Sequence, residues 1–273
     1  MTPTIDERIL NETDPWKLTI RELRLRCQST AAAPERETVN GRRVVRRCSI
    51  HVTRLLLKTS LTPNQITVLS VVVFFFGLGF FFFNTFWWDV VGALTVFFNG
   101  VLDACDGEVA RFRKMKSPIG GAYAEPVSHD IQYGLMFLPL GFAAYARTGL
   151  LWILLLAIFA SVFKLMTRLL ELRYWHLLRP VALAQAEIAE IRTAYFQKSR
   201  GRRFLHWVKR NTFTSSGMVP PLLFVVLIHH IEYYVILYGI SFVLLWALVF
   251  VRQVRGLKTA NLQPTQTEPN ASV

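Results

Sequence analysis

The chain has 273 residues, of which 52% are hydrophobic and 21 are phenylalanine, yet its net charge is +13 at pH 7. Apolar and basic residues must therefore be segregated, which excludes an ordinary water-soluble domain and favours a polytopic membrane protein. The three cysteines form no CxxC pair and are predicted to be free thiols. No cleavable signal peptide is expected, because the first 60 residues are polar and lack its short apolar core.

The N-terminal quarter divides into two predicted segments. Residues 1–40 are expected to be a polar cytosolic segment. Between residues 41 and 60, apolar residues such as Val44, Cys48 and Leu55 recur at helical spacing, interrupted by arginines and lysine. This pattern is typical of a basic amphipathic helix in the membrane interface. Its positive charge, which includes Arg46, would either bind anionic headgroups or take part in the active site.

Six windows of roughly 17 to 25 apolar residues follow, the length that crosses about 30 Å of hydrocarbon. Thr62 and Pro63 form an N-cap and a first helical position, so the first span should begin sharply there. The chain is thus predicted to be an all-α integral membrane protein with a six-helix catalytic domain at 61–256. The predicted spans are Asn64 to Phe83, Trp87 to Phe112, Ala122 to Tyr145, Leu150 to Leu170, Phe213 to His230 and Tyr233 to Val251.

Charge orients these spans. Arg147 is the only lysine or arginine in the three short connections on one side, whereas the other side is rich in both. The positive-inside rule places both termini in the cytosol of a plasma or bacterial inner membrane. The basic segment 174–212 is read as a cytosolic loop that is solvated or touches lipid, rather than as a nucleic-acid site. Residues 257–273 are polar and are expected to be a disordered tail.

Two carboxylates interrupt the second span, at Asp103 and Asp106. At about 100° per residue, Asp103, Gly107 and Ala110 share one helix face, flanked by Asp106 and Arg111. Carboxylate oxygens suit Mg²⁺ or Mn²⁺, and such ions usually hold a phosphate as well. The sequence therefore predicts a divalent metal site and a phosphate-containing substrate at the cytosolic end of this span.

The fourth span also carries charge, because Lys164 and Arg168 lie four residues apart on one helix face. Ionisable residues at membrane depth usually face a protein interior or a cavity. Both residues are therefore assigned to a polar acceptor pocket, although Arg168 is near enough to the cytosol for its side chain to reach the interface instead.

The acidic pattern continues beyond Arg111 with Gly121, Glu125 and His129, so the whole run is DxxDGxxAR, nine residues, GxxxExxxH. It closely resembles the signature of the CDP-alcohol phosphotransferase family, which is DxxDGxxAR followed after eight or nine residues by GxxxDxxxD. The run from Thr62 to Thr67 also resembles this family, and the resemblance extends over residues 49–145.

The resemblance implies a six-helix fold, usually a homodimer, that binds two divalent metals and a CDP-linked donor. An acceptor hydroxyl attacks the β-phosphate of the donor, and CMP leaves. The expected metal positions are Asp103, Asp106, Glu125 and His129, the last two being the catalytic positions as well. The positions expected around the CDP moiety are Gly107, Ala110, Arg111, Asn64 and Thr67.

The sequence departs from the family at the third and fourth acidic positions. Glu125 keeps a carboxylate on a longer arm, whereas His129 removes a negative charge and puts the second metal ion in doubt. On a helix, His129 lies about 40° from Glu125 and Asp130 about 140° away, so His129 is expected to face the metals. A neutral imidazole can accept the proton of a hydroxyl or ligate a metal, and both roles remain open.

The predicted function is metal-dependent transfer of a phosphoalcohol, with membrane lipids as the surroundings and no nucleic acid as partner. A phosphatidyl group from CDP-diacylglycerol passing to a polar polyol, with or without a phosphate, fits the basic stripe best. The alternatives are a soluble CDP-alcohol donor with a lipid or inositol phosphate acceptor, a CDP-diacylglycerol hydrolase, and a nucleotide-binding scaffold without turnover. A transporter is disfavoured because no charged residue marks a pathway through the outer half of the membrane.

Overall fold

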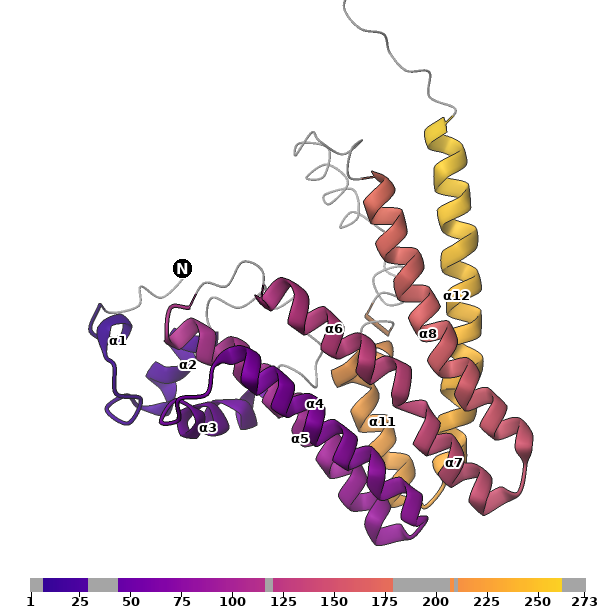
Figure 1. The fold of residues 1–273 in the computed structure, drawn as a ribbon, viewed down its shortest axis with the longest axis horizontal. Coiled ribbons are helices and arrows are strands. Elements are labelled where there is room, and N and C mark those ends of the chain that lie inside the picture. The colour runs from indigo at the N-terminus through magenta and orange to yellow at the C-terminus, as the bar shows by residue number, and fades with distance from the viewer. Residues whose placement is uncertain (1–6, 29–43, 116–119, 179–206, 209–210, 262–273) are drawn as a thin grey trace, which may run out of the picture.

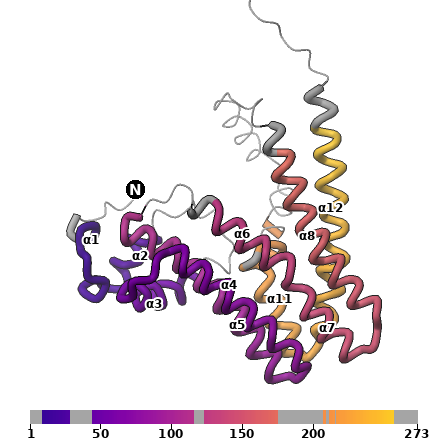
Figure 2. Tube along the Cα trace, in the orientation of Figure 1, coloured from indigo at the N-terminus to yellow at the C-terminus, as the bar shows by residue number. Residues whose placement is uncertain are grey.

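The computed structural model describes residues 7–28, 44–115, 120–178, 207–208 and 211–261, and these ranges contain helices but no strand. The helices form a long bundle with a small N-terminal cluster at one end (Figures 1 and 2). In chain order they are α1 (Glu7–Asn11), α2 (Ile20–Gln28), α3 (Arg46–Leu56), α4 (Pro63–Phe80), the 3₁₀ turn η3 (Phe81–Phe83), α5 (Phe86–Phe112), α6 (Gly120–Leu135), α7 (Phe137–Thr148), α8 (Leu151–Leu178), α11 (Ser215–Leu227) and α12 (Ile231–Asn261).

Helix α4 begins where the sequence predicts. The Thr62 hydroxyl accepts a hydrogen bond from the Gln65 backbone N–H at 3.3 Å, and the Gln65 side chain accepts one from the Thr62 N–H at 2.9 Å. This reciprocal cap satisfies two N–H groups that the first turn would otherwise leave without partners.

Helices α4 and α5 form an antiparallel hairpin. The chain reverses at Asn84, whose φ of 50° places it in the left-handed region. The helices then approach so closely that a Cβ on Gly92 would lie 2.8 Å from the carbonyl oxygen of Gly77. The reversal brings the first turns of α4 beside the last turns of α5.

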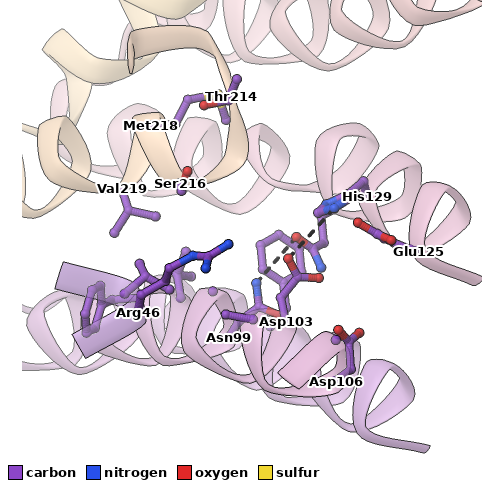
Figure 3. A pocket seen from close by; sticks show the side chains of 18 of the residues that line it. Arg46, Asn99, Asp103, Asp106, Glu125, His129, Thr214, Ser216, Met218 and Val219 are labelled. Carbon is purple, nitrogen blue, oxygen red and sulfur yellow. Dashed lines mark hydrogen bonds and ion pairs between the residues drawn. The ribbon is translucent and has the colours of Figure 1, made fainter. Parts of the chain in front are cut away.

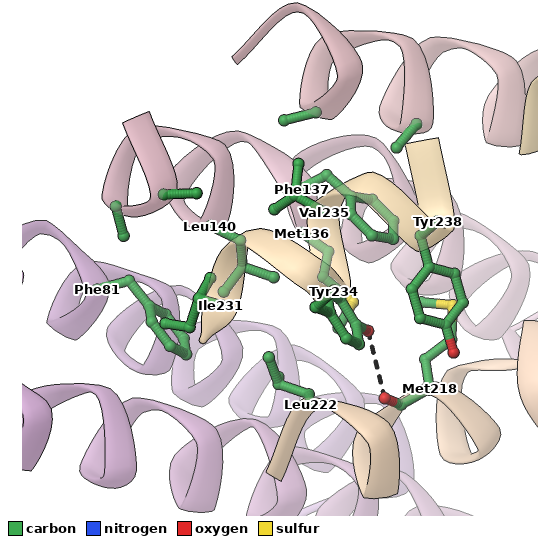
Figure 4. Packing of buried hydrophobic residues seen from close by; sticks show 14 of the residues in the cluster. Phe81, Met136, Phe137, Leu140, Met218, Leu222, Ile231, Tyr234, Val235 and Tyr238 are labelled. Atoms are coloured by element: carbon green, nitrogen blue, oxygen red, sulfur yellow. Dashed lines mark hydrogen bonds between the residues drawn. The ribbon is translucent and has the colours of Figure 1, made fainter. Parts of the chain in front are cut away.

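The remaining helices form the other side of the bundle. Helix α6 leads into α7, and α7 ends at Gly149, whose φ of 70° makes the turn into α8. Helices α8 and α12 pack along each other, and α11 packs against α5. Phe137 of α7 anchors the core, with ring centroids 5.9 Å from Tyr234 and 5.8 Å from Tyr238 (Figure 4).

Within the described ranges, four helices are long and apolar enough to cross a membrane, which indicates an integral membrane protein. They are Pro63–Phe83, Phe86–Phe112, Leu151–Tyr174 and Ile231–Gly256. The predicted third span is divided between α6 and α7, and the predicted fifth span contains the 13-residue helix α11. Six crossings therefore stay a prediction.

Two helices extend past their predicted ends. Helix α8 continues to Leu178 and enters the predicted loop, and α12 continues to Asn261, five residues into the segment predicted as a disordered tail. Apart from 174–178, 207–208 and 211–212, the predicted loop lies outside the described residues, as do residues 262–273.

The N-terminal cluster packs on the end of α5 that carries the two aspartates. The polar segment predicted at 1–40 contains α1 and α2. Leu18, which lies between these helices, and Leu23 and Cys27 of α2 are buried together with Phe112 of α5. Sparse apolar residues in a charged segment gave no strong helical pattern, but they suffice to dock two short helices on a larger surface.

The turn region at the opposite end is held by charge. Arg147 forms an ion pair with Asp89 of α5 and donates a hydrogen bond to Asn84 Oδ1 at 2.7 Å. Asp89 is only 1% exposed, so its carboxylate depends on this partner. The one basic residue predicted in these connections thus fastens α7 to the α4–α5 hairpin.

Candidate active site

A cavity of about 470 Å³ lies where α5, α6, the start of α3 and the start of α11 meet (Figure 3). Six of the eleven predicted site residues line it, and apolar side chains make up another part of its lining. The charged or titratable residues that line it are Arg46, Asp103, Asp106, Glu108, Arg111, Glu125, His129 and Tyr133.

Asp106 is tied to the first helix of the hairpin. Its Oδ2 accepts a hydrogen bond from Thr67 Oγ1 at 2.6 Å. The Thr67 hydroxyl also lies 3.2 Å from the carbonyl oxygen of Pro63, one turn earlier in α4. Thr67 therefore orients a carboxylate that faces the cavity.

Asp103 faces His129 across the gap between α5 and α6. The distance from His129 Nε2 to Asp103 Oδ2 is 3.8 Å, which is too long for a hydrogen bond. Among the described residues, neither Asp103 Oδ1 nor His129 Nδ1 has a hydrogen-bond partner, although both atoms are buried. Both side chains thus retain hydrogen-bonding or ligating capacity in the cavity.

Glu125 and Asp130 of α6 point in different directions, as the helix angle requires. Glu125 lines the cavity and is exposed, with its carboxylate near His129 in Figure 3. Asp130 instead forms an ion pair with Arg168 of α8. Asp130 therefore points away from the cavity, as the helix angle predicts. His129, and not Asp130, lines the cavity.

Gly107 makes room for a neighbouring side chain. A Cβ at this position would lie 3.1 Å from Arg111 Nη1, so the absent side chain leaves space for the guanidinium to lie along α5. Arg111 Nε donates a hydrogen bond to the carbonyl oxygen of Cys27 near the end of α2. The backbone of the N-terminal cluster thereby holds the arginine of the motif at the edge of the cavity.

Arg46, at the start of α3, also lines the cavity; the sequence left its basic helix open to either a lipid anchor or a role at the active site. Its Nη1 donates to the carbonyl oxygen of Gln28 at 3.3 Å. Burial lowers the pKa of Arg46 from its ordinary value, and the nearby positive charge of Arg111 lowers it further, while Glu108 opposes both. Two guanidinium groups that disfavour each other would both be stabilised by a bound anion.

Glu108 was given no role from the sequence. It is 1% exposed and accepts three hydrogen bonds, from Gln28 Nε2 at 2.8 Å, Ser49 Oγ at 2.6 Å and Thr53 Oγ1 at 2.7 Å. The sequence feature that could have indicated this contact is the pair Ser49 and Thr53. Their hydroxyls lie one turn apart on α3, and buried hydroxyls need a polar partner. This junction fixes α2 and α3 against α5.

Several predicted binding residues lie elsewhere. Lys164 is 8% exposed; it donates to the carbonyl oxygen of Phe213 at 2.6 Å and lies 4.4 Å from the Tyr133 ring centroid. Lys164 and Arg168 do not line the cavity, and neither do Asn64 and Ala110. Their contacts with substrate stay predictions.

The donor set fits a divalent metal ion, although no three His, Cys, Asp or Glu side chains of the described residues converge as a ready coordination sphere. Asp103, Asp106 and Glu125 supply three carboxylates to one cavity, and a buried carboxylate oxygen without a hydrogen-bond donor needs a compensating cation. Oxygen-rich sites of this kind suit Mg²⁺ or Mn²⁺.

Fold and site together define an all-helical membrane protein with an acidic, guanidinium-edged cavity that opens among its helices. The sequence profile of the CDP-alcohol phosphatidyltransferase family matches residues 60–252, which is more than half of the chain. The chain therefore belongs to the CDP-alcohol phosphatidyltransferase family. Membership implies transfer of a phosphoalcohol from a CDP-alcohol to an acceptor, and the family is generally dependent on divalent metal ions. A comparison with curated proteins found no match.

Proposed function

We propose that this protein transfers a phosphatidyl group from CDP-diacylglycerol to the hydroxyl of a polar polyol, with or without a phosphate, and releases CMP. The observation that carries the proposal is the composition of the single cavity described above. Its lining includes four carboxylates and two guanidinium groups, together with a set of apolar side chains. The apolar lining includes Phe74, Val96, Phe97, Met218 and Val219.

A cavity of this mixed kind suits a donor that carries both a charged diphosphate and a lipid tail. Arg46 and Arg111 lie at its edge and can bind phosphate oxygens, which guanidinium groups recognise well. The apolar wall belongs to α4, α5 and α11, three helices of the membrane bundle. A soluble CDP-alcohol would leave much of that wall without a partner.

In the proposed reaction, the acceptor hydroxyl oxygen bonds to the β-phosphorus of the donor. The bond from that phosphorus to the bridging oxygen breaks, and CMP leaves with the electron pair. A ring nitrogen of His129 accepts the hydroxyl proton, since neither nitrogen forms a short hydrogen bond with the described residues. Arg111, held by the Cys27 carbonyl, and Arg46 keep the phosphates in place.

Asp103, Asp106 and Glu125, with His129 as a further candidate ligand, are the side chains that would hold Mg²⁺ or Mn²⁺. A divalent ion so bound neutralises their charge and stabilises the negative charge of the transferring phosphate. Thr67 keeps the Asp106 carboxylate turned toward the cavity.

The activity is tested with purified protein in lipid nanodiscs, CDP-diacylglycerol and Mg²⁺ or Mn²⁺, with and without polyol acceptors. CMP release that requires an acceptor, together with a new phospholipid, would support the proposal. CMP formed in water alone would identify a hydrolase, and donor binding without CMP would identify a scaffold. Transfer from a water-soluble CDP-alcohol to a lipid acceptor would favour the reverse arrangement of substrates.

We also propose that α3 lies in the cytosolic membrane interface. It buries Ser49, Ile50 and Thr53, while Val44, Cys48 and Leu55 form an exposed apolar stripe within about 40° of one another. Such a stripe beside arginines suits the headgroup region. Cytosolic termini, six crossings and a homodimer complete the expected arrangement, and cysteine accessibility from each side of sealed vesicles would test the topology.

A further inference from the structure

Two buried amide side chains line the cavity about one helical turn from Asp103 and His129. Asn99 of α5 is 5% exposed and Gln132 of α6 is 4% exposed, and both line the cavity. Asn99 Nδ2 donates to Gln132 Oε1 at 3.4 Å, which is a long hydrogen bond. The two side chains thus bridge α5 and α6, the same two helices that carry Asp103 and His129.

This amide pair has unused hydrogen-bonding capacity. Asn99 Oδ1 and Gln132 Nε2 are buried and have no partner among the described residues. Exchanging O and N in both amides would reverse the bond but would again leave one acceptor and one donor over. In either assignment the pair leaves one donor atom and one acceptor atom without a partner among the described residues, and both residues line the cavity.

The amide pair and the Asp103–His129 pair lie one after the other along α5 and α6, in the same cavity. Asn99 precedes Asp103 by four residues on α5, and Gln132 follows His129 by three residues on α6. Because the two helices run in opposite directions, both steps lead away from the cytosolic end. At 1.5 Å rise per residue, the two pairs are roughly 5 to 6 Å apart.

We propose that Asn99 and Gln132 select the acceptor by binding a second hydroxyl of a polyol, while its first hydroxyl is placed beside His129 for attack. This inference rests on the proposed function and specifies its acceptor. A hydroxyl donates one hydrogen bond and accepts others, so it can satisfy the acceptor and the donor that the amide pair leaves open.

The same chemistry disfavours amino alcohols. A protonated amine can donate to an amide oxygen but cannot accept from an amide N–H, and a trimethylammonium group can do neither. Sites that hydrogen-bond a substrate hydroxyl reject analogues without it strongly, because the buried polar groups are then left unpaired. The protein should therefore use a neutral polyol segment and reject ethanolamine and choline.

The test uses the full-length protein in nanodiscs with CDP-diacylglycerol and Mg²⁺. Acceptors are glycerol, inositol and their monophosphates, the best polyol's analogue lacking one further hydroxyl, and the amino alcohols ethanolamine and choline. The variants Asn99→Leu and Gln132→Met keep side-chain size and remove the amide. Ser161→Ala is the matched control, because Ser161 Oγ is also buried without a partner among the described residues but lies outside the cavity.

We expect Asn99→Leu and Gln132→Met to raise the polyol KM by about 10- to 100-fold while the donor KM changes less than about twofold. Both variants should lose most of the wild-type preference for the polyol over its deoxy analogue. Ser161→Ala should leave both KM values unchanged. An exchanged pair, Asn99→Gln with Gln132→Asn, keeps an amide on each helix and should recover part of the acceptor affinity.

The outcomes separate this inference from the proposed function. No acceptor-dependent CMP release by the wild type would overturn both. A wild type that transfers to polyols, with variants whose polyol KM and deoxy discrimination are unchanged, would overturn the inference alone. So would a preference for amino alcohols, an equal rise in donor KM, or an exchanged pair no better than Asn99→Leu.

Discussion

The position of the catalytic base can be decided by replacing two adjacent residues. His129 Nε2 lies 3.8 Å from Asp103 Oδ2 and the ring lines the cavity, whereas Asp130 is paired with Arg168 outside it. Removing a general base slows a reaction by about 10² to 10⁴, so His129→Ala should lose that much kcat. His129→Asp should keep measurable activity, because it restores the acidic residue that the family pattern has there.

Asp130→Ala should change little. The side chains of Asp130 and Arg168 are 37% and 30% exposed. Ion pairs at this exposure contribute about 0.2 to 1 kcal/mol to folding stability, which is a factor of about five or less in the ratio of folded to unfolded protein. CMP release at saturating donor and acceptor measures kcat, and thermal melting checks that each variant is folded. An inactive Asp130→Ala with an active His129→Ala would show that Asp130 supplies the base, which contradicts the observed direction of both side chains.

The same variants separate the two roles left open for His129. If the imidazole is a metal ligand, raising the Mg²⁺ concentration should restore much of the activity of His129→Ala, because weakened affinity is offset by mass action. If it is the base alone, the loss should persist at saturating metal. A metal titration of wild type and His129→Ala therefore assigns the role.

Three further results are expected. Asp103→Asn and Asp106→Asn should each abolish turnover and weaken Mn²⁺ binding measured by electron paramagnetic resonance, and near wild-type activity of either would refute the metal assignment. Lys164→Ala should lower the melting temperature by several degrees, because it removes a buried ammonium–carbonyl hydrogen bond. A rise in the acceptor KM alone would support the predicted role of Lys164 in acceptor binding. Equal changes in the donor and acceptor KM values would indicate that Lys164 has only a structural role. Membrane-permeant N-ethylmaleimide at pH 8 should label Cys48, which is not buried in the protein, faster than Cys27, which should react only after unfolding. Burial raises the pKa of Cys27 to about 12 and leaves about one thiolate in 10⁴. Equal labelling rates would mean that α2 is not packed on α5.

Features set within one helix could be predicted from the sequence. The cap at Thr62 depends on residues next to it, and it is observed. The separation of His129 from Asp130 follows from the helical angle alone, and the two side chains do diverge. Helix periodicity also placed Asp103 on the face that lines the cavity.

Features that depend on which helices meet could not be predicted. Arg46 was read with the other charges of its helix, because nothing in the local pattern shows that its N-terminal end abuts the acidic cavity. Lys164 was expected to need a polar pocket, but a backbone carbonyl and aromatic rings serve a buried ammonium equally well. Gln132 lies 33 residues from Asn99, and only the packing of α6 on α5 makes them a pair.

The hydrogen bonds to Glu108 affect where the chain can be truncated. The family match begins at residue 60, so a truncation at that boundary would look conservative by homology. It would nevertheless remove Gln28, Ser49 and Thr53, all three donors to a carboxylate that is 1% exposed, and leave an uncompensated charge two residues after Asp106. A chain that begins at residue 60 is therefore expected to be markedly less stable than the full chain, which thermal melting of the two would measure.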